Sequence, residues 1–322
     1  AYAVDREQGA LRRLNAVSSQ GKATCHMDIV TIPGTNDTFL AAASYFGPGF
    51  SLHRIVKENG RTKGIAEAHY VGDHNAVKRV GTRSVVFPGP NKARQEAAHP
   101  HMCVFDVRNV LKTPRDEKGR RCQHVFLHVV DLGIDAVLRY RLDVSTGRCE
   151  YLDALTLPTG AGPRHMCFHP TVPVAYVINE LNSTISTCAV EEDGSLRIID
   201  TVSALPYDFR GTGDDSISTC AAIRVHPTGR WVYASNRVVD GSGVLSHFEV
   251  RPKDGALRFK SATMTGGSTP RDFNFASKGE EVLVGNQESG NVISFRVDAT
   301  TGALSFTGAK AKSPTPVCLC VL

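Results

Sequence analysis

The sequence has no long apolar run and no stretch with the periodicity of a long amphipathic helix. No apolar segment approaches the ~20 residues that a membrane-spanning helix requires. We therefore predict no membrane partner and a chain built from strands.

Signatures of metal and cofactor chemistry are also missing. No histidines and carboxylates are spaced as in zinc sites, and no acidic cluster suggests a calcium loop. A glycine-rich phosphate loop and a G-x-S-x-G nucleophile elbow are absent too. These absences predict a protein that uses neither a metal nor a cofactor.

The nine cysteines include no C-x-x-C pair. Most of them, including Cys318 and Cys320, lie inside apolar strand patterns, which is typical of buried, reduced thiols. This usage predicts a cytoplasmic protein. The net charge of +5 is small and spread along the chain. Such a charge argues against a nucleic-acid partner and suits a small anionic substrate.

The sequence is rich in turns, with 29 glycines and 16 prolines. One signature recurs: a strand, a polar turn, a glycine, one residue and then an apolar residue. The glycines of its best copies are Gly9, Gly147, Gly194, Gly255 and Gly302. The second and third copies are 47 positions apart, as are the fourth and fifth. Each repeat holds four short alternating strands, which predicts the blade of a β-propeller.

We predict a single all-β domain over residues 1–322, with five complete four-stranded blades and partial blades at both termini. The blades span residues 24–71, 99–157, 162–205, 219–265 and 269–311. Residues 1–20 have the pattern of the last two strands of a blade, and residues 315–322 that of a first strand. We expect the N-terminal part of the ring to be missing, by roughly 60 residues.

Two segments interrupt the repeat. Residues 72–98 lead directly into His99-Pro100-His101, so we expect this insertion to cover a site. Residues 108–123 are rich in charge, and we expect a solvated loop there.

Candidate site residues lie at equivalent strand ends. First strands line the central channel of a propeller, and their second residues, aligned on a Pro or Cys start, are mostly basic or titratable. These residues are His26, His101, Arg164, Ala221, Arg271 and Val317. Second strands end in a polar residue, mostly an Asn or Asp that we expect to bond turn backbone, followed by a variable residue. The variable residues are Tyr45, Leu132, Glu180, Arg237 and Gln287.

Together these positions predict a pocket of arginines with one or two histidines and a single glutamate. Arginine binds carboxylate or phosphate groups in a bidentate manner. Histidine, with an ordinary pKa near ~6.5, is suited to general acid–base catalysis. The alternative that each residue is satisfied locally stays open, and we expect packing or turn roles for His128, His165, His169 and His226.

At these residues the chain resembles the seven-bladed propeller lactonases. That family includes the cycloisomerase-type 6-phosphogluconolactonases of bacteria and the fungal 3-carboxy-cis,cis-muconate lactonising enzyme. The motifs cover almost the whole chain. They are Arg94-Gln95 before His99-Pro100-His101, Asp131-Leu132-Gly133, Gly162-Pro163-Arg164-His165, Asn179-Glu180-Leu181, Ser235-Asn236-Arg237, Pro270-Arg271-Asp272-Phe273 and Asn286-Gln287.

The resemblance implies seven blades in the parent protein and an active site formed by a histidine, two arginines and a glutamate. By motif, the catalytic residues are His101, Arg164, Glu180 and Arg237. We expect the substrate contacts to be His26, Arg94, His99, Arg271 and Gln287.

The implied activity is hydrolysis of a sugar lactone, above all 6-phosphogluconolactone, with His101 activating water and arginines binding the anionic group. One alternative is a cycloisomerase that forms a lactone from a carboxymuconate. Another is a non-catalytic propeller that serves as an interaction platform. The oligomeric state is left open.

Overall fold

The computed structural model describes residues 1–5, 7–33, 35, 37–115, 121–206, 218–238 and 243–321. Within these ranges the chain is strand and turn, with one short 3-10 helix, η3 (Ser277–Gly279). No helix among the described residues is long and apolar enough to cross a membrane. The predicted all-β propeller class is confirmed by the succession of antiparallel sheets.

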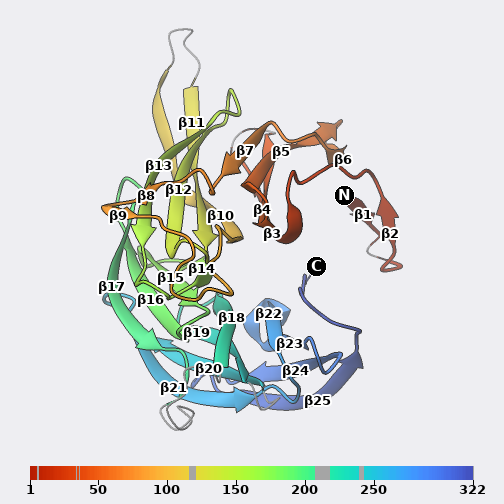
Figure 1. Ribbon diagram of the computed structural model, residues 1–322. Coiled ribbons are helices and arrows are strands. Elements are labelled where there is room, and N and C mark those ends of the chain that lie inside the picture. Colours follow the sequence, from red (N-terminus) through yellow and green to blue (C-terminus); the bar gives the residue numbers. More distant parts are fainter. Residues whose placement is uncertain are drawn as a thin grey trace. The chain divides into compact units, whose positions relative to one another are not determined.

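The described residues form two compact units (Figure 1). Unit 1 comprises Ala1–Leu157 with Glu192–Ser195, and unit 2 comprises Pro158–Glu191 with Leu196–Leu322.

Unit 2 holds three four-stranded antiparallel sheets, in which each strand pairs with the next one in sequence. The first is β14 (Pro163–Phe168), β15 (Val174–Asn179), β16 (Thr184–Val190) and β17 (Leu196–Ser203). The second is β18 (Ser218–Val225), β19 (Trp231–Val238), β20 (Gly243–Val250) and β21 (Leu257–Met264). The third is β22 (Pro270–Ala276), β23 (Glu281–Asn286), β24 (Asn291–Val297) and β25 (Leu304–Lys312).

The first strands of these sheets lie side by side, β14 next to β18 and β18 next to β22 (Figure 1). Apolar side chains fill the spaces between successive sheets. One core cluster includes Tyr176, Ile223 and Phe248, and the next includes Tyr233 and Phe273. Blades therefore stabilise one another face to face, as in a propeller.

Hydrogen bonds tie each blade of unit 2 to the next through the predicted turn glycines. The Tyr176 hydroxyl donates to the carbonyl of Gly255 at 2.7 Å, and the Tyr233 hydroxyl donates to that of Gly302 at 2.6 Å. Each tyrosine lies on the second strand of its blade, and each glycine lies in the last turn of the following blade. The repeated glycine is thus both a turn residue with positive φ and an acceptor for its neighbour.

Unit 1 contains one regular sheet and one interrupted sheet. The regular one is β10 (Pro100–Arg115), β11 (Arg121–Asp131), β12 (Ala136–Asp143) and β13 (Cys149–Thr156). The other is β3 (Lys22–Thr31), β4 (Thr38–Phe46), β5 (Gly49–Glu58) and β6 (Arg61–Ile65), with β7 (Tyr70–Asp73) also paired to β5. Two strand pairs complete the unit: β1 (Tyr2–Val4) with β2 (Leu11–Arg13), and β8 (Arg79–Val80) with β9 (Arg83–Ser84).

The five larger sheets coincide with the five predicted blades, and residues 1–20 form the expected strand pair. Residues 313–321 differ from the prediction because they contain no strand. Side chains of β22 bond this segment instead: the Asp272 carboxylate accepts from the Leu319 N–H, and the Asn274 amide donates to the Leu319 carbonyl. The two cysteines of the segment are exposed rather than packed.

The predicted loop at 108–123 is also corrected. Strands β10 and β11 continue through most of it as a paired ladder, up to Arg115 opposite Arg121. Residues 116–120 lie outside the described residues.

Candidate active site

A β-bulge sits at the second residue of several first strands. In β14, Pro163 pairs with Asn179 and His165 with Ile178, so Arg164 is the extra residue of the bulge. The same shift leaves out His101 in β10 and Arg271 in β22. A bulge re-aims its extra side chain, and here that side chain is basic or titratable in each case.

The register corrects the alignment of one predicted residue. In β3 the shift falls between Thr24 and His26, so Cys25 is the extra residue. His26 is therefore not at the position of His101 and Arg164, although it follows a cysteine that resembles the other strand starts. It lies half-buried on β3, and its contact with substrate stays a prediction.

The predicted asparagines of the second strands have structural roles, although β19 continues beyond Asn236 to Val238. Asn179, Asn236 and Asn286 are fully buried and pair with the residue just before the bulge. Their side-chain amides bond neighbouring backbone and hydroxyl groups, for example Asn236 Nδ2 to the Ala204 carbonyl at 3.2 Å and Asn286 Nδ2 to the Thr265 carbonyl at 3.0 Å. These asparagines fix the strand ends that carry the variable residues.

Three of the four predicted catalytic residues meet in unit 2. Arg164 Nε lies 2.9 Å from Glu180 Oε2, and Arg237 Nη2 lies 3.1 Å from the same oxygen. The side chains of Arg164 and Glu180 are 2% and 1% exposed, and that of Arg237 is 16% exposed. One buried carboxylate therefore lies between two guanidinium groups, and the cluster keeps a net positive charge.

Backbone groups hold the same cluster. Arg164 Nη1 donates to the Ala221 carbonyl at 2.6 Å, and Arg237 Nη2 donates to the Cys220 carbonyl at 2.8 Å. The Glu180 N–H donates to the Gly162 carbonyl at 2.7 Å. Because Arg164 and Arg237 bond the carbonyls of adjacent residues of β18, that strand fixes the spacing of the two guanidinium groups.

Two further predicted contacts pair with each other in unit 2. Arg271 Nη1 donates to Gln287 Oε1 at 3.2 Å, across the end of the third blade, and both residues are half-buried. The predicted alignment of strand ends accounts for this pairing. Because the Gln287 amide is uncharged, this hydrogen bond does not neutralise the charge of Arg271.

His99, His101 and Arg94 gather around one aromatic ring in unit 1. The Tyr45 ring stacks on the His99 ring with centroids 4.2 Å apart, and the His101 ring meets its edge at 5.9 Å. Arg94 Nε donates to the Tyr45 hydroxyl at 3.2 Å. His99 Nε2 lies 2.9 Å from Glu96 Oε1. The insertion 72–98 thus supplies a cation and an anion beside the two histidines.

Most of the histidines expected to have structural roles do have them. His169 Nε2 and His226 Nε2 lie 2.7 and 3.0 Å from the carbonyls of Gly229 and Gly279 in the next blade. Burial lowers the pKa of His128 to about 4 against the opposing charge of Asp106, so this ring is neutral near pH 7. His165 Nε2 lies 3.1 Å from Arg164 Nη1, and the packing role of His165 stays a prediction.

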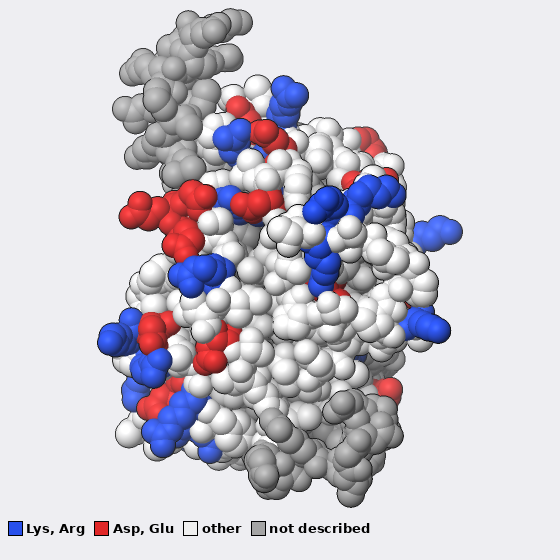
Figure 2. All heavy atoms as spheres, turned by 60° about the vertical axis from the view of Figure 1, so that its left-hand side comes forward, with Lys and Arg blue, Asp and Glu red and all other residues white. Residues whose placement is uncertain are grey.

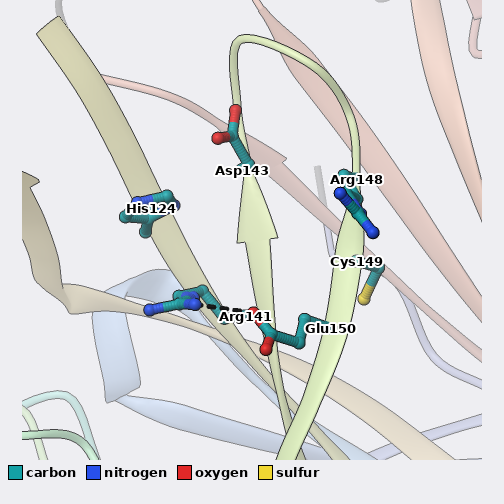
Figure 3. Close-up of a pocket in the computed structure, with 6 residues that line it drawn as sticks. All are labelled: His124, Arg141, Asp143, Arg148, Cys149 and Glu150. Carbon is teal, nitrogen blue, oxygen red and sulfur yellow. Dashed lines mark hydrogen bonds and ion pairs between the residues drawn. The ribbon is translucent and has the colours of Figure 1, made fainter. Parts of the chain in front are cut away.

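A hollow at the β12–β13 hairpin has no predicted site residue among those that line it (Figure 3). Its volume is about 330 Å³ and it is lined by His124, Arg141, Asp143, Arg148, Cys149 and Glu150. Arg141 and Glu150 pair at 2.6 Å, and burial raises the pKa of the Cys149 thiol to about 12. The thiol is protonated at neutral pH and cannot act there as a nucleophile.

Among the described residues, no group of three or more His, Cys, Asp or Glu side chains is arranged to hold a metal ion. The eight described cysteines are free, and burial raises the pKa of Cys167, Cys188 and Cys220 to about 12. Figure 2 shows basic and acidic side chains interspersed over the described part of one face. The predicted absence of metals, cofactors and nucleic acid stays a prediction.

The comparisons with known proteins agree with this architecture. The sequence model described as lactonase, 7-bladed beta-propeller matches residues 1–321. A 6-phosphogluconolactonase of Bacillus subtilis strain 168 is 30% identical over 99% of this chain and 79% of its own. One from Formosa agariphila is 28% identical over 94% of this chain and 75% of its own.

A solved structure is also similar to this chain. The periplasmic gluconolactonase of Pseudomonas aeruginosa superimposes with a TM-score of 0.74 and 25% identity, covering 98% of this chain and 77% of that one. These relatives identify the chain as a propeller enzyme of the carboxylic-ester hydrolase class. The chain belongs to the seven-bladed β-propeller lactonase family, which confirms the predicted resemblance.

Proposed function

We propose that this chain hydrolyses 6-phosphogluconolactone, a cyclic sugar ester that carries a phosphate group. The observation that carries the proposal is the cluster in which Arg164 and Arg237 flank the buried carboxylate of Glu180 with a net positive charge. Two relatives that align with most of the chain are named 6-phosphogluconolactonases. A fixed cationic group suits both a phosphate and the negative charge that develops on a lactone carbonyl oxygen.

In this proposal the arginines bind and stabilise charge, and Glu180 orients them. Both guanidinium groups are already held by the carboxylate and by backbone carbonyls. Their orientation is therefore set before a substrate arrives, which is the condition for electrostatic stabilisation of a transition state. A carboxylate that bonds two arginines is poorly suited to carry protons, so Glu180 has a positioning role.

His101 is the proposed general base, as the resemblance implies. It takes a proton from water while the water oxygen bonds to the lactone carbonyl carbon. The ring C–O bond then breaks, and the ring oxygen takes up a proton to give the open-chain acid. Arg94, His99, Arg271, Gln287 and His26 are the proposed substrate contacts. A cytoplasmic location is part of the proposal, supported by the described cysteines, which form no disulfide.

Hydrolysis assays on paired arginine variants test the proposal. Arg237→Gln should lower kcat/KM for 6-phosphogluconolactone about 100-fold. Arg224→Gln is the matched control, since Arg224 lies on β18 and pairs with Asp272 instead, and it should change kcat/KM less than about threefold. His101→Gln should lower kcat.

Two results would count against this activity. One is equal hydrolysis by both arginine variants and His101→Gln. The other is loss of the ultraviolet absorbance of a carboxymuconate without lactone hydrolysis, which would identify the cycloisomerase instead.

A further inference from the structure

Unit 1 contains a buried chain of three polar side chains that includes none of the proposed catalytic residues. The Tyr140 hydroxyl lies 3.1 Å from His74 Nε2, and His74 Nδ1 lies 2.7 Å from Asp131 Oδ2. His74 and Asp131 are fully buried, and Tyr140 is 3% exposed. The three residues come from three segments: the end of β7, the end of β11 and the middle of β12.

The three side chains form one continuous line of hydrogen bonds. Burial raises the pKa of Tyr140, so its hydroxyl keeps its proton at neutral pH. That hydroxyl bonds His74 Nε2, and His74 Nδ1 bonds the Asp131 carboxylate.

The second oxygen of Asp131 binds the segment that carries the predicted histidines. Asp131 Oδ1 accepts from the His99 N–H at 2.9 Å and from the Gly133 N–H at 2.9 Å. The His99 ring in turn stacks on Tyr45, and His101 lies two positions further along the sequence. The carboxylate therefore connects His74 on one side with the backbone of His99 on the other.

Packing leaves His74 little freedom to move. The Phe50 ring lies edge-on to the His74 ring at 5.8 Å and to the Tyr140 ring at 4.8 Å. A Cβ at Gly72 would lie 2.1 Å from the Phe50 ring, so only glycine fits beneath it. The His74 N–H also donates to the Pro48 carbonyl at 2.6 Å.

We propose that Tyr140, His74 and Asp131 are positioning residues that hold the His99–His101 segment in its working geometry. This proposal rests on the proposed function, in which His101 is the base. A buried carboxylate that lost His74 would be left with fewer partners and would shift to recover them. The His99 backbone would shift with it, and displacement of a catalytic group by about 1 Å can cost about 100-fold in rate.

Variants of the full chain separate this role from general stability. Tyr140→Phe removes one hydroxyl and should lower kcat about fivefold, with KM unchanged, while His74→Leu should lower kcat about 100-fold. His74→Asn keeps a donor near Asp131 and should restore most of the rate. Tyr176→Phe is the matched control: it removes an equally buried tyrosine hydrogen bond in unit 2 and should leave kcat unchanged.

Amide hydrogen exchange at His99 gives a readout that needs no substrate. We expect faster exchange in Tyr140→Phe and His74→Leu than in the parent and in Tyr176→Phe. Unchanged exchange, or a kcat equal to that of the parent, would overturn the positioning role. If the parent hydrolyses no lactone, the proposed function fails, and the exchange alone then decides whether the chain of residues holds the segment.

Discussion

At the scale of single residues, Glu180 shows how strongly one buried charge depends on its partners. Glu180→Gln would keep the shape of the side chain but leave Arg164, 2% exposed, without its ionic partner. We expect the free energy of unfolding to fall by about 3 kcal/mol. Urea unfolding of the variant and the parent measures the difference.

Glu191→Gln is the control for that experiment. Its ion pair with Arg197 is exposed, with side chains 46% and 65% accessible. Its removal should change stability by less than about 1 kcal/mol. Equal losses in the two variants would contradict a special role for the buried cluster.

His247 provides a prediction about pH. Burial, helped by the charge of Lys260, lowers its pKa from 6.5 to about 4, against the opposing effect of Glu249. Above pH 6.5 the ring is neutral in both the folded and unfolded states. As the pH falls from 6.5 toward 4, the unfolded state binds the proton first, so the free energy of unfolding decreases.

The His247→Asn variant should lose less stability in this window than the parent does. Urea unfolding of both proteins at about pH 7 and about pH 5 measures the two losses. Carboxylates titrate in both proteins alike, so the difference between the losses reports His247. Equal losses would show that this ring does not titrate as described.

At the scale of elements, the last turn of each blade in unit 2 is constrained from two sides. Gly302 has a φ of +74°, and a Cβ there would lie 2.6 Å from His247 Nε2 and from Trp231. Gly302→Ala should therefore lower the free energy of unfolding by more than about 2 kcal/mol. Gly60 has a φ of +73° with nothing within 4 Å of a Cβ, so Gly60→Ala should cost only about 1 kcal/mol.

Thermal unfolding of the two alanine variants separates backbone strain from contact with the neighbouring blade. A similar fall in Tm for both would mean that φ alone accounts for the cost, and that the contact with the preceding blade contributes nothing.

The sequence predicts these elements well because their signals are local. Alternating strands and turn glycines are recognised from neighbouring residues. The same local pattern then returns at a fixed spacing, as at Gly255 and Gly302, which are 47 positions apart. The bulge in β3 is different, because the ladder register decides whether Cys25 or His26 is the extra residue. A strand start alone does not contain that information. Residues 315–322 give a second example. Their apolar pattern predicts a strand, but the described residues of this segment join no ladder.

At the scale of the whole molecule, the candidate site was predictable only where the repeat applies. Arg164 is the second residue of a first strand, and Glu180 and Arg237 follow the asparagines of second strands, so aligning the repeats finds them. His74 lies in an insertion that has no counterpart in other blades, and its partner Asp131 is 57 positions away. No periodicity connects the two, and only the folded chain brings them together.

The charge of the molecule gives one further prediction. The net charge is +5, and charges of both signs are interspersed on the face in Figure 2. Electrostatic steering of an anionic substrate toward the protein should therefore be weak. Raising salt from about 0.05 M to about 0.5 M should lower kcat/KM for 6-phosphogluconolactone less than about tenfold, and should leave that for uncharged gluconolactone unchanged. A steep dependence would require a concentrated basic surface.

The tyrosine–glycine hydrogen bonds of unit 2 limit the exchange of single blades by evolution or by engineering. Cut at its loops, the blade that contains Tyr233 would carry away a donor without its acceptor, Gly302, and an acceptor, Gly255, without its donor, Tyr176. A transplanted or duplicated blade must therefore match both neighbours. A segment from Tyr176 to Gly255 does not avoid this requirement, because it contains Tyr233, whose acceptor Gly302 lies outside it.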